Sequence, residues 1–391
     1  MSRTPDDDLP PDSPLARAFG QPLMLGLFLP VYDGGWSPSA APRTTTWTYP
    51  YNAALARRAE ELGFDLLFGP AEWVGKGGYG GKIRFRENSI DPFITTAALA
   101  SATQRILLIS TVHVLYGGWH PLLLARFGAT LDHISQGRWG INVVTGHSVR
   151  EAAMFGQTRA EHDLRYDMAD EFVTIMKALW RREENLTFDG RFWKLESAFV
   201  SPAPTFGRPV LVSATGSPAG FGYAARHADI VFVTSPAGAQ IDNALAALPA
   251  HVAALKQTGM REGRRLRALI NPMVICRPSE REAREYYEHI VHEADDEAVD
   301  GYFRHFALAD SKAWGKHDRS GRIVGRIVGG NVQLVGDPQQ VADGIEKLHR
   351  AGCDGVQLSF FDFKPDLEFF GEHVLPLLEA KGLRRRPASP D

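Results

Sequence analysis

The stretch ILLISTVHVLYGGWHPLLLARFGATLDHISQGRWGINVVTG, residues 106–146, contains a complete strand–helix–strand unit. Residues 106–114 and 137–146 are short, nearly continuous apolar runs, which indicate strands buried on both faces. Between them, residues 121–135 carry apolar side chains at helical spacing, and Pro121 suits the first turn of a helix. Two buried strands joined by a helix predict a parallel pair of strands.

The same alternation continues in both directions along the chain. Apolar runs predict further strands at 23–30, 64–69, 209–215, 229–234, 267–276 and 354–361. Amphipathic stretches predict further helices at 51–63, 91–103, 163–182, 217–227, 239–259, 279–293, 337–351 and 365–380. Eight buried strands alternating with helices favour an α/β fold of the closed (β/α)8 TIM-barrel type over an open doubly wound sheet.

We expect a single domain, a barrel over residues 22–382 with three insertions. The insertions are a Gly-rich segment at 70–90, a hairpin around Asp189–Gly190 at 184–208, and a long charged segment at 294–333. Residues 1–21 and 383–391 are rich in Pro, Ser and charged side chains and are expected to be disordered tails. We therefore expect Arg384, Arg385 and Arg386 to be solvated.

Composition excludes several classes of protein. Of the 391 residues, 44% are hydrophobic and 23% are charged, which is ordinary for a globular protein. Lys and Arg number 43 and Asp and Glu 46, a net charge of −3, so we expect neither nucleic acid nor a membrane surface as a partner. There is no signal peptide and no apolar run long enough to span a membrane, which predicts a cytoplasmic protein.

The side chains that bind metals do not form a site in this sequence. Cys276 and Cys353 are too few for a disulfide framework or a multi-cysteine metal site, and are expected to be buried. His289 and His292 lie three residues apart on an amphipathic helix with no third ligand in prospect, so a solvated helix face is the better interpretation. No metal site is predicted.

Two glycine motifs are candidates for a phosphate-binding site. Gly75–Gly80 has the G-x-G-x-x-G spacing of dinucleotide sites, but no helix follows at once, so a loop over the barrel mouth is the better interpretation. At Gly216–Ser217 a strand ends, the serine can cap the next helix, and Pro218 suits its first turn. This turn is either a plain helix cap or a phosphate site at a helix N-terminus.

Two histidines fall where the third and fourth strands end. His113 closes the strand at 106–114, and His147 directly follows the strand at 137–146. Side chains at the C-terminal ends of barrel strands are the ones that carry catalysis or bind ligands. A single histidine can equally well be structural, and both interpretations stay open for each.

Seven segments, in order along nearly the whole chain, carry a resemblance to a known family: FLPVYDGGW (28–36), GYGGK (78–82), GRWGINVVTG (137–146), RYDMADEFV (165–173), FDGRFW (188–193), ATGSPAGFGYAARHAD (214–229) and DGVQLSFFDF (354–363). The sequence resembles the bacterial luciferase-like flavin monooxygenases, and within them the branch of pyrimidine, dimethylsulfone and alkanesulfonate monooxygenases. The segments GGW, GYGGK, VVTG and DFKPDLEFFGEHVLPLL (362–378) are most like pyrimidine monooxygenase.

The resemblance implies a (β/α)8 barrel that receives FMNH2 from a separate NAD(P)H:flavin reductase. Oxygen would be activated as a flavin (hydro)peroxide, which oxygenates a small substrate. The resemblance also implies a homo-oligomer, a dimer or a tetramer. Carried over position by position, the flavin site would comprise Asn142, Glu151, Arg165, Tyr166, Gly216 and Ser217.

The sequence departs from this family at two places. His147 stands where these relatives carry tryptophan, and the segment GPAEWVGKGGYGGK (69–82) is about three residues longer than in pyrimidine monooxygenase. The family's lysine near there is unmatched, and Ala71 and Glu72 lie nearest to its place. Both departures concern the flavin ring or the substrate, which leaves a pyrimidine, a sulfone, a sulfonate and a halogenated aromatic all open. His113 and His147 are the candidates for contacts to substrate or peroxide.

Three further questions stay open. The segment 294–333 is either a lid or a solvated loop, and the cations that such a lid would carry are Lys312, Lys316, Arg319, Arg322 and Arg326. Hydride transfer with a flavin or a deazaflavin is the alternative reaction in the same barrel. A flavin-binding protein without catalytic activity is the other alternative.

Overall fold

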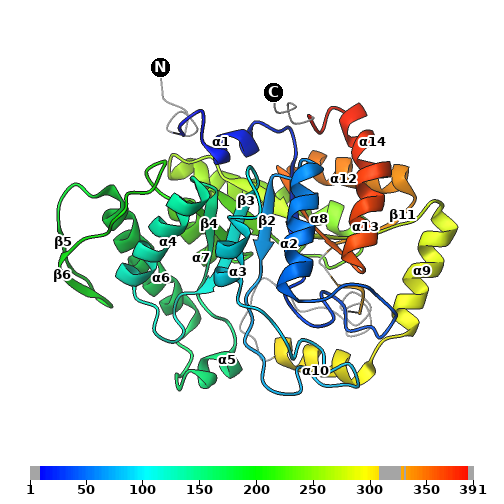
Figure 1. The fold of residues 1–391 in the computed structure, drawn as a ribbon, viewed down its shortest axis with the longest axis horizontal. Helices are drawn as coiled ribbons and strands as arrows, with labels where there is room; N and C mark the ends of the chain where they lie inside the picture. Colours follow the sequence, from blue (N-terminus) through cyan, green and yellow to red (C-terminus); the bar gives the residue numbers. More distant parts are fainter. Residues whose placement is uncertain (1–8, 308–326, 330–331, 386–391) are drawn as a thin grey trace.

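A computed structural model describes residues 9–307, 327–329 and 332–385 of the chain. Within these residues, eight parallel strands form a closed barrel with helices around it (Figure 1). The strands of the ring are β1 (Met24–Phe28), β2 (Leu66–Gly69), β3 (Leu107–His113), β4 (Trp139–Val144), β7 (Val210–Ala214), β8 (Ile230–Val233), β9 (Arg267–Ile270) and β12 (Gly355–Phe360).

The strands follow one another around the ring in chain order, and β12 pairs with β1 to close it. In that closing pair Met24 lies opposite Gly355 and Leu27 opposite Leu358. Nearly every residue of these strands is buried, because side chains on one face fill the barrel and those on the other face meet the helices. The predicted (β/α)8 barrel is thus confirmed.

The helices cover the outside of the barrel close to their predicted positions. They are α2 (Tyr49–Glu61), α3 (Pro92–Leu99), α4 (Pro121–Ser135), α6 (His162–Arg181), α7 (Pro218–His227), α8 (Ile241–Arg261), α9 (Glu280–His292), α12 (Pro338–Arg350), α13 (Phe363–Phe369) and α14 (Leu375–Ala380). Inside the ring the core is aromatic: Phe68 packs against Phe28 at 5.2 Å and against Phe232 at 4.6 Å between ring centroids. None of the described helices combines the length and apolar character that crossing a bilayer requires.

Two of the insertions contain regular structure. The hairpin expected around Asp189–Gly190 forms from β5 (Leu186–Asp189) and β6 (Lys194–Ala198), which pair antiparallel. The third insertion begins with α10 (Asp296–Ala307) and ends in β11 (Val332–Gly336). Strand β11 pairs with β10 (Pro272–Cys276), which continues β9 beyond the ring. The five cations expected in a lid lie outside the described residues.

Both ends of the chain differ from the predicted tails. Residues 14–19 form helix α1 (Pro14–Phe19), capped by Ser13, and the buried Leu15 and Ala18 of this helix join the barrel interior. Figure 1 shows α1 across one end of the barrel, opposite α5 (Val149–Met154) and α10. At the other terminus Arg384 is buried and not solvated, because it forms an ion pair with Asp65. Cys276 and Cys353 are buried free thiols, as expected.

Candidate active site

The two predicted histidines lie together at the C-terminal end of the barrel. His113 is the last residue of β3, and His147 lies in the loop after β4. The centroids of the two rings are 6.5 Å apart, and the rings are nearly perpendicular, at 88°. His113 is buried, with 5% of its surface exposed. Position at a strand end therefore brings both side chains to the edge of the barrel where TIM-barrel sites form.

Glu151 returns to this pair of histidines on the short helix α5. The helix begins at Ser148, whose hydroxyl accepts a hydrogen bond from the Glu151 amide at 3.2 Å. The Glu151 side chain is 1% exposed and places Oε2 at 3.4 Å from His113 Nδ1. Its other oxygen accepts a hydrogen bond from the Trp73 amide at 3.3 Å. A carboxyl group and two imidazoles thus meet in a buried site.

Burial sets the protonation of these three groups. Burial, reinforced by the nearby Glu72 carboxylate, raises the pKa of Glu151 to about 8. Burial, with a smaller effect of His147, lowers the pKa of His113 to about 3. Burial, followed by the neighbouring His305, lowers the pKa of His147 to about 4. At neutral pH the site therefore holds a protonated carboxyl group and two neutral imidazoles.

We expect the exchange Glu151→Gln to flatten the dependence of stability on pH. Between pH 4.5, the ordinary pKa, and pH 8 the folded protein keeps a proton that the unfolded chain releases. Stability from this group is therefore complete below pH 4.5 and falls as the pH rises through 8. From pH 5 to pH 9 the wild type should lose about 1–3 kcal/mol more unfolding free energy than the variant. Urea unfolding at several pH values measures this.

The matched control for this exchange is Glu183→Gln, at an exposed glutamate. The free energy of unfolding of Glu183→Gln should depend on pH as that of the wild type does. Parallel profiles for Glu151→Gln and the wild type would contradict a protonated Glu151.

Glu72 does not point a free carboxylate at this site. It forms an ion pair with Arg86 at 2.7 Å, with 9% and 5% of the two side chains exposed, and it accepts a hydrogen bond from the Tyr79 hydroxyl. The Arg86 guanidinium also lies over the rings of Tyr32, at 4.7 Å, and Tyr302, at 5.1 Å. Since Tyr302 belongs to α10, this cluster fastens the first and third insertions to each other. Ala71, the other predicted residue there, is half-buried just after β2.

The start of α6 holds the loop that follows β4. Arg165 is 3% exposed and donates a hydrogen bond to the carbonyl of Gly146. Arg159 donates to the carbonyl of His147 at 2.9 Å. Gly146 has φ +74°, and a Cβ there would overlap the ring of Tyr116, so this turn needs glycine. Arg159, just before α6, and Arg165, in its first turn, therefore fix the loop that carries His147.

Hydroxyl groups and free backbone amides meet where α7 begins. Ser217 caps α7, and its hydroxyl accepts a hydrogen bond from the Gly220 amide at 3.1 Å. The hydroxyl of Tyr166, from α6, lies 3.3 Å from that of Thr215. A Cβ at Gly220 would overlap the Thr215 hydroxyl, so the close approach requires glycine. Gly216 lies in the turn between these groups. Such a helix start, lined with hydroxyls, suits a phosphate.

Asn142 lies on β4, one strand from the hydroxyl cluster, which we define as Tyr166, Thr215 and Ser217. Its Nδ2 donates to the Thr111 hydroxyl at 3.2 Å. Its buried Oδ1 has no hydrogen-bond partner among the described residues. A buried acceptor of this kind normally has a partner, so a ligand N–H donor would complete the site. FMN offers both groups that these residues lack, a phosphate and ring N–H donors. The residues present fit that cofactor.

Sequence reasoning missed the residues that hold the site together. Arg86 and Tyr116 stand in no motif that points to them, Thr215 lies in the motif at 214–229 without a role being assigned to it, and Arg86 has φ +63°, which no pattern in the sequence indicates. The one available signal was Thr215, which directly precedes the Gly216–Ser217 turn. No cluster of three or more possible metal ligands occurs in the part of the chain that the structure describes.

Comparison with known proteins gives matches over most of the chain. The family described as luciferase-like monooxygenase matches residues 24–355. The FMNH(2)-dependent dimethylsulfone monooxygenase of Pseudomonas fluorescens is 30% identical over 94% of this chain and 98% of its own length. The pyrimidine monooxygenase RutA of Escherichia coli is 30% identical over 92% of this chain and 97% of its own.

Solved structures match with similar coverage. Riboflavin lyase (RcaE), solved with modified FMN and its substrate riboflavin, is 25% identical with a TM-score of 0.76, over 93% of this chain and 92% of that one. DmoA of Hyphomicrobium sulfonivorans has a TM-score of 0.80 at 22% identity, over 95% and 90% of the two chains. At that identity the second likeness concerns the fold alone.

Proposed function

Since the chain belongs to the luciferase-like monooxygenase family, we propose that it is the oxygenating component of a two-component, FMNH2-dependent monooxygenase. The observation that carries this is the hydroxyl cluster at the start of α7, together with the unpartnered buried oxygen of Asn142 on β4, the strand next to β7. Two relatives of 30% identity over nearly their full length carry monooxygenase names, and one of these names FMNH(2).

Each side chain has a defined task in this proposal. Ser217 and the backbone amide of Gly216 bind the phosphate at the start of α7, with Tyr166 and Arg165 beside them. The amide of Asn142 orients the flavin ring. Reduced FMN, when bound, supplies the electrons that activate oxygen. The insertions joined through Arg86 keep water from the site, where every polar contact then becomes stronger.

We further propose that the substrate is uncharged and polar, as a sulfone or a pyrimidine is. The charge of Arg86, a buried cation of the first insertion, is already balanced by Glu72 at 2.7 Å. Glu151 and His113 instead offer neutral hydrogen-bonding groups.

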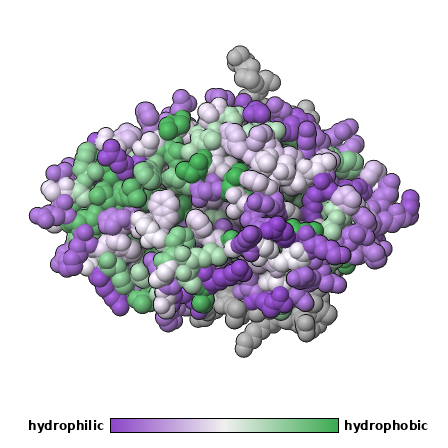
Figure 2. Space-filling view, turned by 60° about the horizontal axis from the view of Figure 1, so that its bottom comes forward, coloured by the Kyte–Doolittle hydropathy of each residue, from purple (hydrophilic) through white to green (hydrophobic). Residues whose placement is uncertain are grey.

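The proposal includes two protein partners. The first is an NAD(P)H:flavin reductase, which provides the FMNH2. The second is another copy of this chain. Figure 2 shows hydrophobic residues gathered toward the side of the molecule on which α4 lies in Figure 1, while the opposite side is largely hydrophilic. Ile94 on α3 and Leu123, Phe127 and Ile134 on one face of α4 are exposed there, which supports an apolar contact between copies. Light scattering of the purified protein should then give a multiple of 43.1 kDa.

The function is tested with the purified protein, a flavin reductase, NADH and matched substrate pairs. We expect oxygen uptake coupled to product with dimethylsulfone or uracil, and little coupling with their anionic counterparts methanesulfonate and orotate. Coupling with the anions alone would overturn the substrate class and keep the monooxygenase. Turnover of a deazaflavin without oxygen would favour the hydride-transfer alternative, and tight FMN retention without any turnover would favour a non-catalytic flavin-binding protein.

A further inference from the structure

A cavity lies at the end of the barrel opposite the candidate active site, beneath α1. Its volume is about 360 Å³, and it opens between the segments that lead into β4, β7, β8 and β9. One wall is apolar and includes Leu15, Phe19 and Phe206. The other wall carries Arg208 and Arg264. The cavity thus combines an apolar surface with guanidinium groups, at the lower end of the 300–1,000 Å³ range that small-molecule sites occupy.

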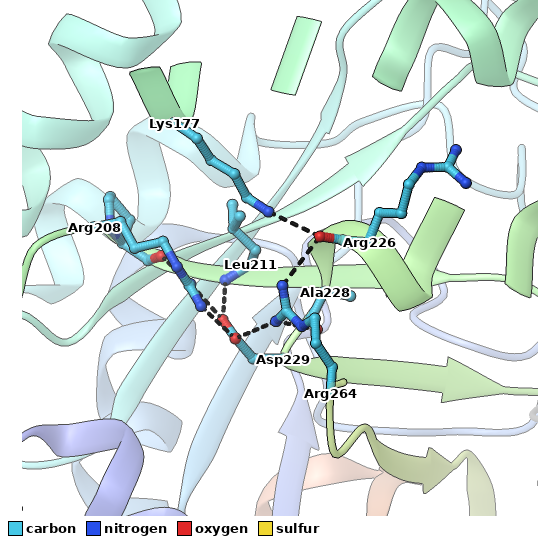
Figure 3. A network of polar contacts seen from close by, with 8 residues as sticks. Lys177, Arg208, Leu211, Arg226, Ala228, Asp229 and Arg264 are labelled. Carbon is cyan, nitrogen blue, oxygen red and sulfur yellow. Dashed lines mark hydrogen bonds and ion pairs between the residues drawn. The ribbon is translucent and has the colours of Figure 1, made fainter. Parts of the chain in front are cut away.

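Asp229 is the acidic residue of this cavity (Figure 3). Its carboxylate accepts two hydrogen bonds from Arg208, at 2.7 and 2.6 Å, and one from Arg264, at 3.1 Å. It also accepts the Leu211 amide at 2.9 Å. One carboxylate therefore faces two guanidinium groups, which leaves a positive charge in a partly buried site, where water screens it less than at the open surface.

Lys177 is a further cation close to Arg208 and Arg264. Its ammonium donates to the carbonyl of Arg226 at 3.1 Å (Figure 3). Burial, followed by the charges of Arg264 and Arg208, lowers the pKa of Lys177 to about 7. The other carboxylate nearby, Asp170, is itself paired with the Arg226 guanidinium at 2.7 Å.

We propose that this cavity binds a small organic oxyanion, with its carboxylate, sulfonate or phosphate group on Arg208 and Arg264 and its apolar body against Phe19 and Phe206. Guanidinium groups are the preferred partners of oxyanions because their N–H groups match the oxygens in pairs. The apolar wall gains free energy when it is covered. This cavity and the proposed flavin site have no residue in common.

An anion bound in this cavity would also stabilise the barrel. Arg208 precedes β7, Asp229 precedes β8, and Arg264 lies in the turn between α8 and β9. A ligand held by both arginines connects these loops, and a ligand that binds only the folded state raises its stability by mass action. The site therefore has a readout that does not depend on activity.

Calorimetric titration of the purified full chain with phenyl phosphate tests the proposal. Two comparison ligands separate the contributions: inorganic phosphate has only the charged group, and benzyl alcohol has only the uncharged aromatic part. We expect phenyl phosphate to bind at least about 10-fold more tightly than inorganic phosphate, because only it covers the apolar wall. Benzyl alcohol should give no measurable binding. Equal affinity for phenyl phosphate and inorganic phosphate, or no binding of either, would overturn the proposal.

Two variants locate the site. Arg264→Gln should weaken phenyl phosphate binding about 10-fold or more, because a charge-assisted pair is lost. Arg261→Gln, at the exposed arginine that ends α8 three residues earlier, is the matched control and should bind as the wild type does. If Arg264→Gln does not fold, Arg264→Lys keeps the charge without the fork and should bind with intermediate affinity. Wild-type affinity in Arg264→Lys would overturn the role of the guanidinium.

Two other occupants are outcomes of the same experiment. If Arg165→Ala abolishes phenyl phosphate binding while Arg264→Gln does not, the probe occupies the flavin site and the proposal is wrong. If binding appears only when Asp6, Asp7 and Asp8 are all replaced by asparagine, the cavity belongs to the chain's own acidic segment and the ligand proposal is also wrong. Loss of phenyl phosphate binding in Arg264→Gln, with binding kept in Arg165→Ala, supports the proposal.

Discussion

Replacement of Arg165 by alanine is expected to raise the dissociation constant of FMN about 100-fold, which corresponds to about 2.7 kcal/mol. Arg165 lies in the first turn of α6, next to Tyr166, and is 3% exposed. Two effects add in this variant. A permanent charge beside the phosphate is lost, and the Gly146 carbonyl loses the donor that holds the loop carrying His147. Quenching of flavin fluorescence on titration with the protein measures the change.

Two further exchanges separate these effects from a general loss of folding. Arg165→Lys keeps the charge but not the fork, and we expect it to recover only part of the affinity. Arg181→Ala removes an exposed arginine from the last turn of the same helix and should leave FMN binding unchanged. Wild-type affinity in a folded Arg165→Ala protein would remove this residue from the flavin site and leave the hydroxyl cluster as the only candidate for the phosphate.

The barrel could be predicted because each of its strands appears in the sequence as a short apolar run. A continuous apolar run such as LLISTVH (107–113) can be buried on both faces only between helices, and its burial in the structure is complete. Helix α4 was predicted with its observed bounds because Pro121 and the glycine after Gln136 mark its ends. Strand β11 was missed because its run lies inside a long charged segment, and it pairs only with β10, beyond the ring.

The candidate site was predictable where position along the chain decides it. His113 and His147 follow from the rule that strand ends carry the chemistry, and Gly216–Ser217 follows from helix-cap chemistry. The protonated state of Glu151 was not predictable, because it depends on burial and on Glu72, which lies far away in the sequence. The Glu72–Arg86 pair depends in the same way on a loop conformation that only the folded chain shows.

The C-terminal arginines show where composition misleads. RRRPASPD reads as a solvated end, yet the first of its arginines is 3% exposed and its Nη1 lies 2.6 Å from Asp65 Oδ2. The same guanidinium donates to the carbonyl of Leu23 at 2.6 Å and to that of Gly63 at 2.5 Å. Asp65 in turn accepts the Leu25 amide at 2.7 Å. One side chain from the chain end thus joins the start of β1 to the segment before β2.

Arg384→Leu is therefore expected to lower the free energy of unfolding by about 3–5 kcal/mol, because the buried Asp65 carboxylate loses its counter-charge. Arg385→Leu, at the exposed neighbouring arginine, is the matched control and should change stability by less than about 0.5 kcal/mol. The double variant Asp65→Asn/Arg384→Leu should recover part of the loss, since no uncompensated charge stays buried. Urea unfolding of the four proteins measures these differences. Equal midpoints for Arg384→Leu and Arg385→Leu would mean that the chain end is a solvated tail after all, and that the barrel closes without it.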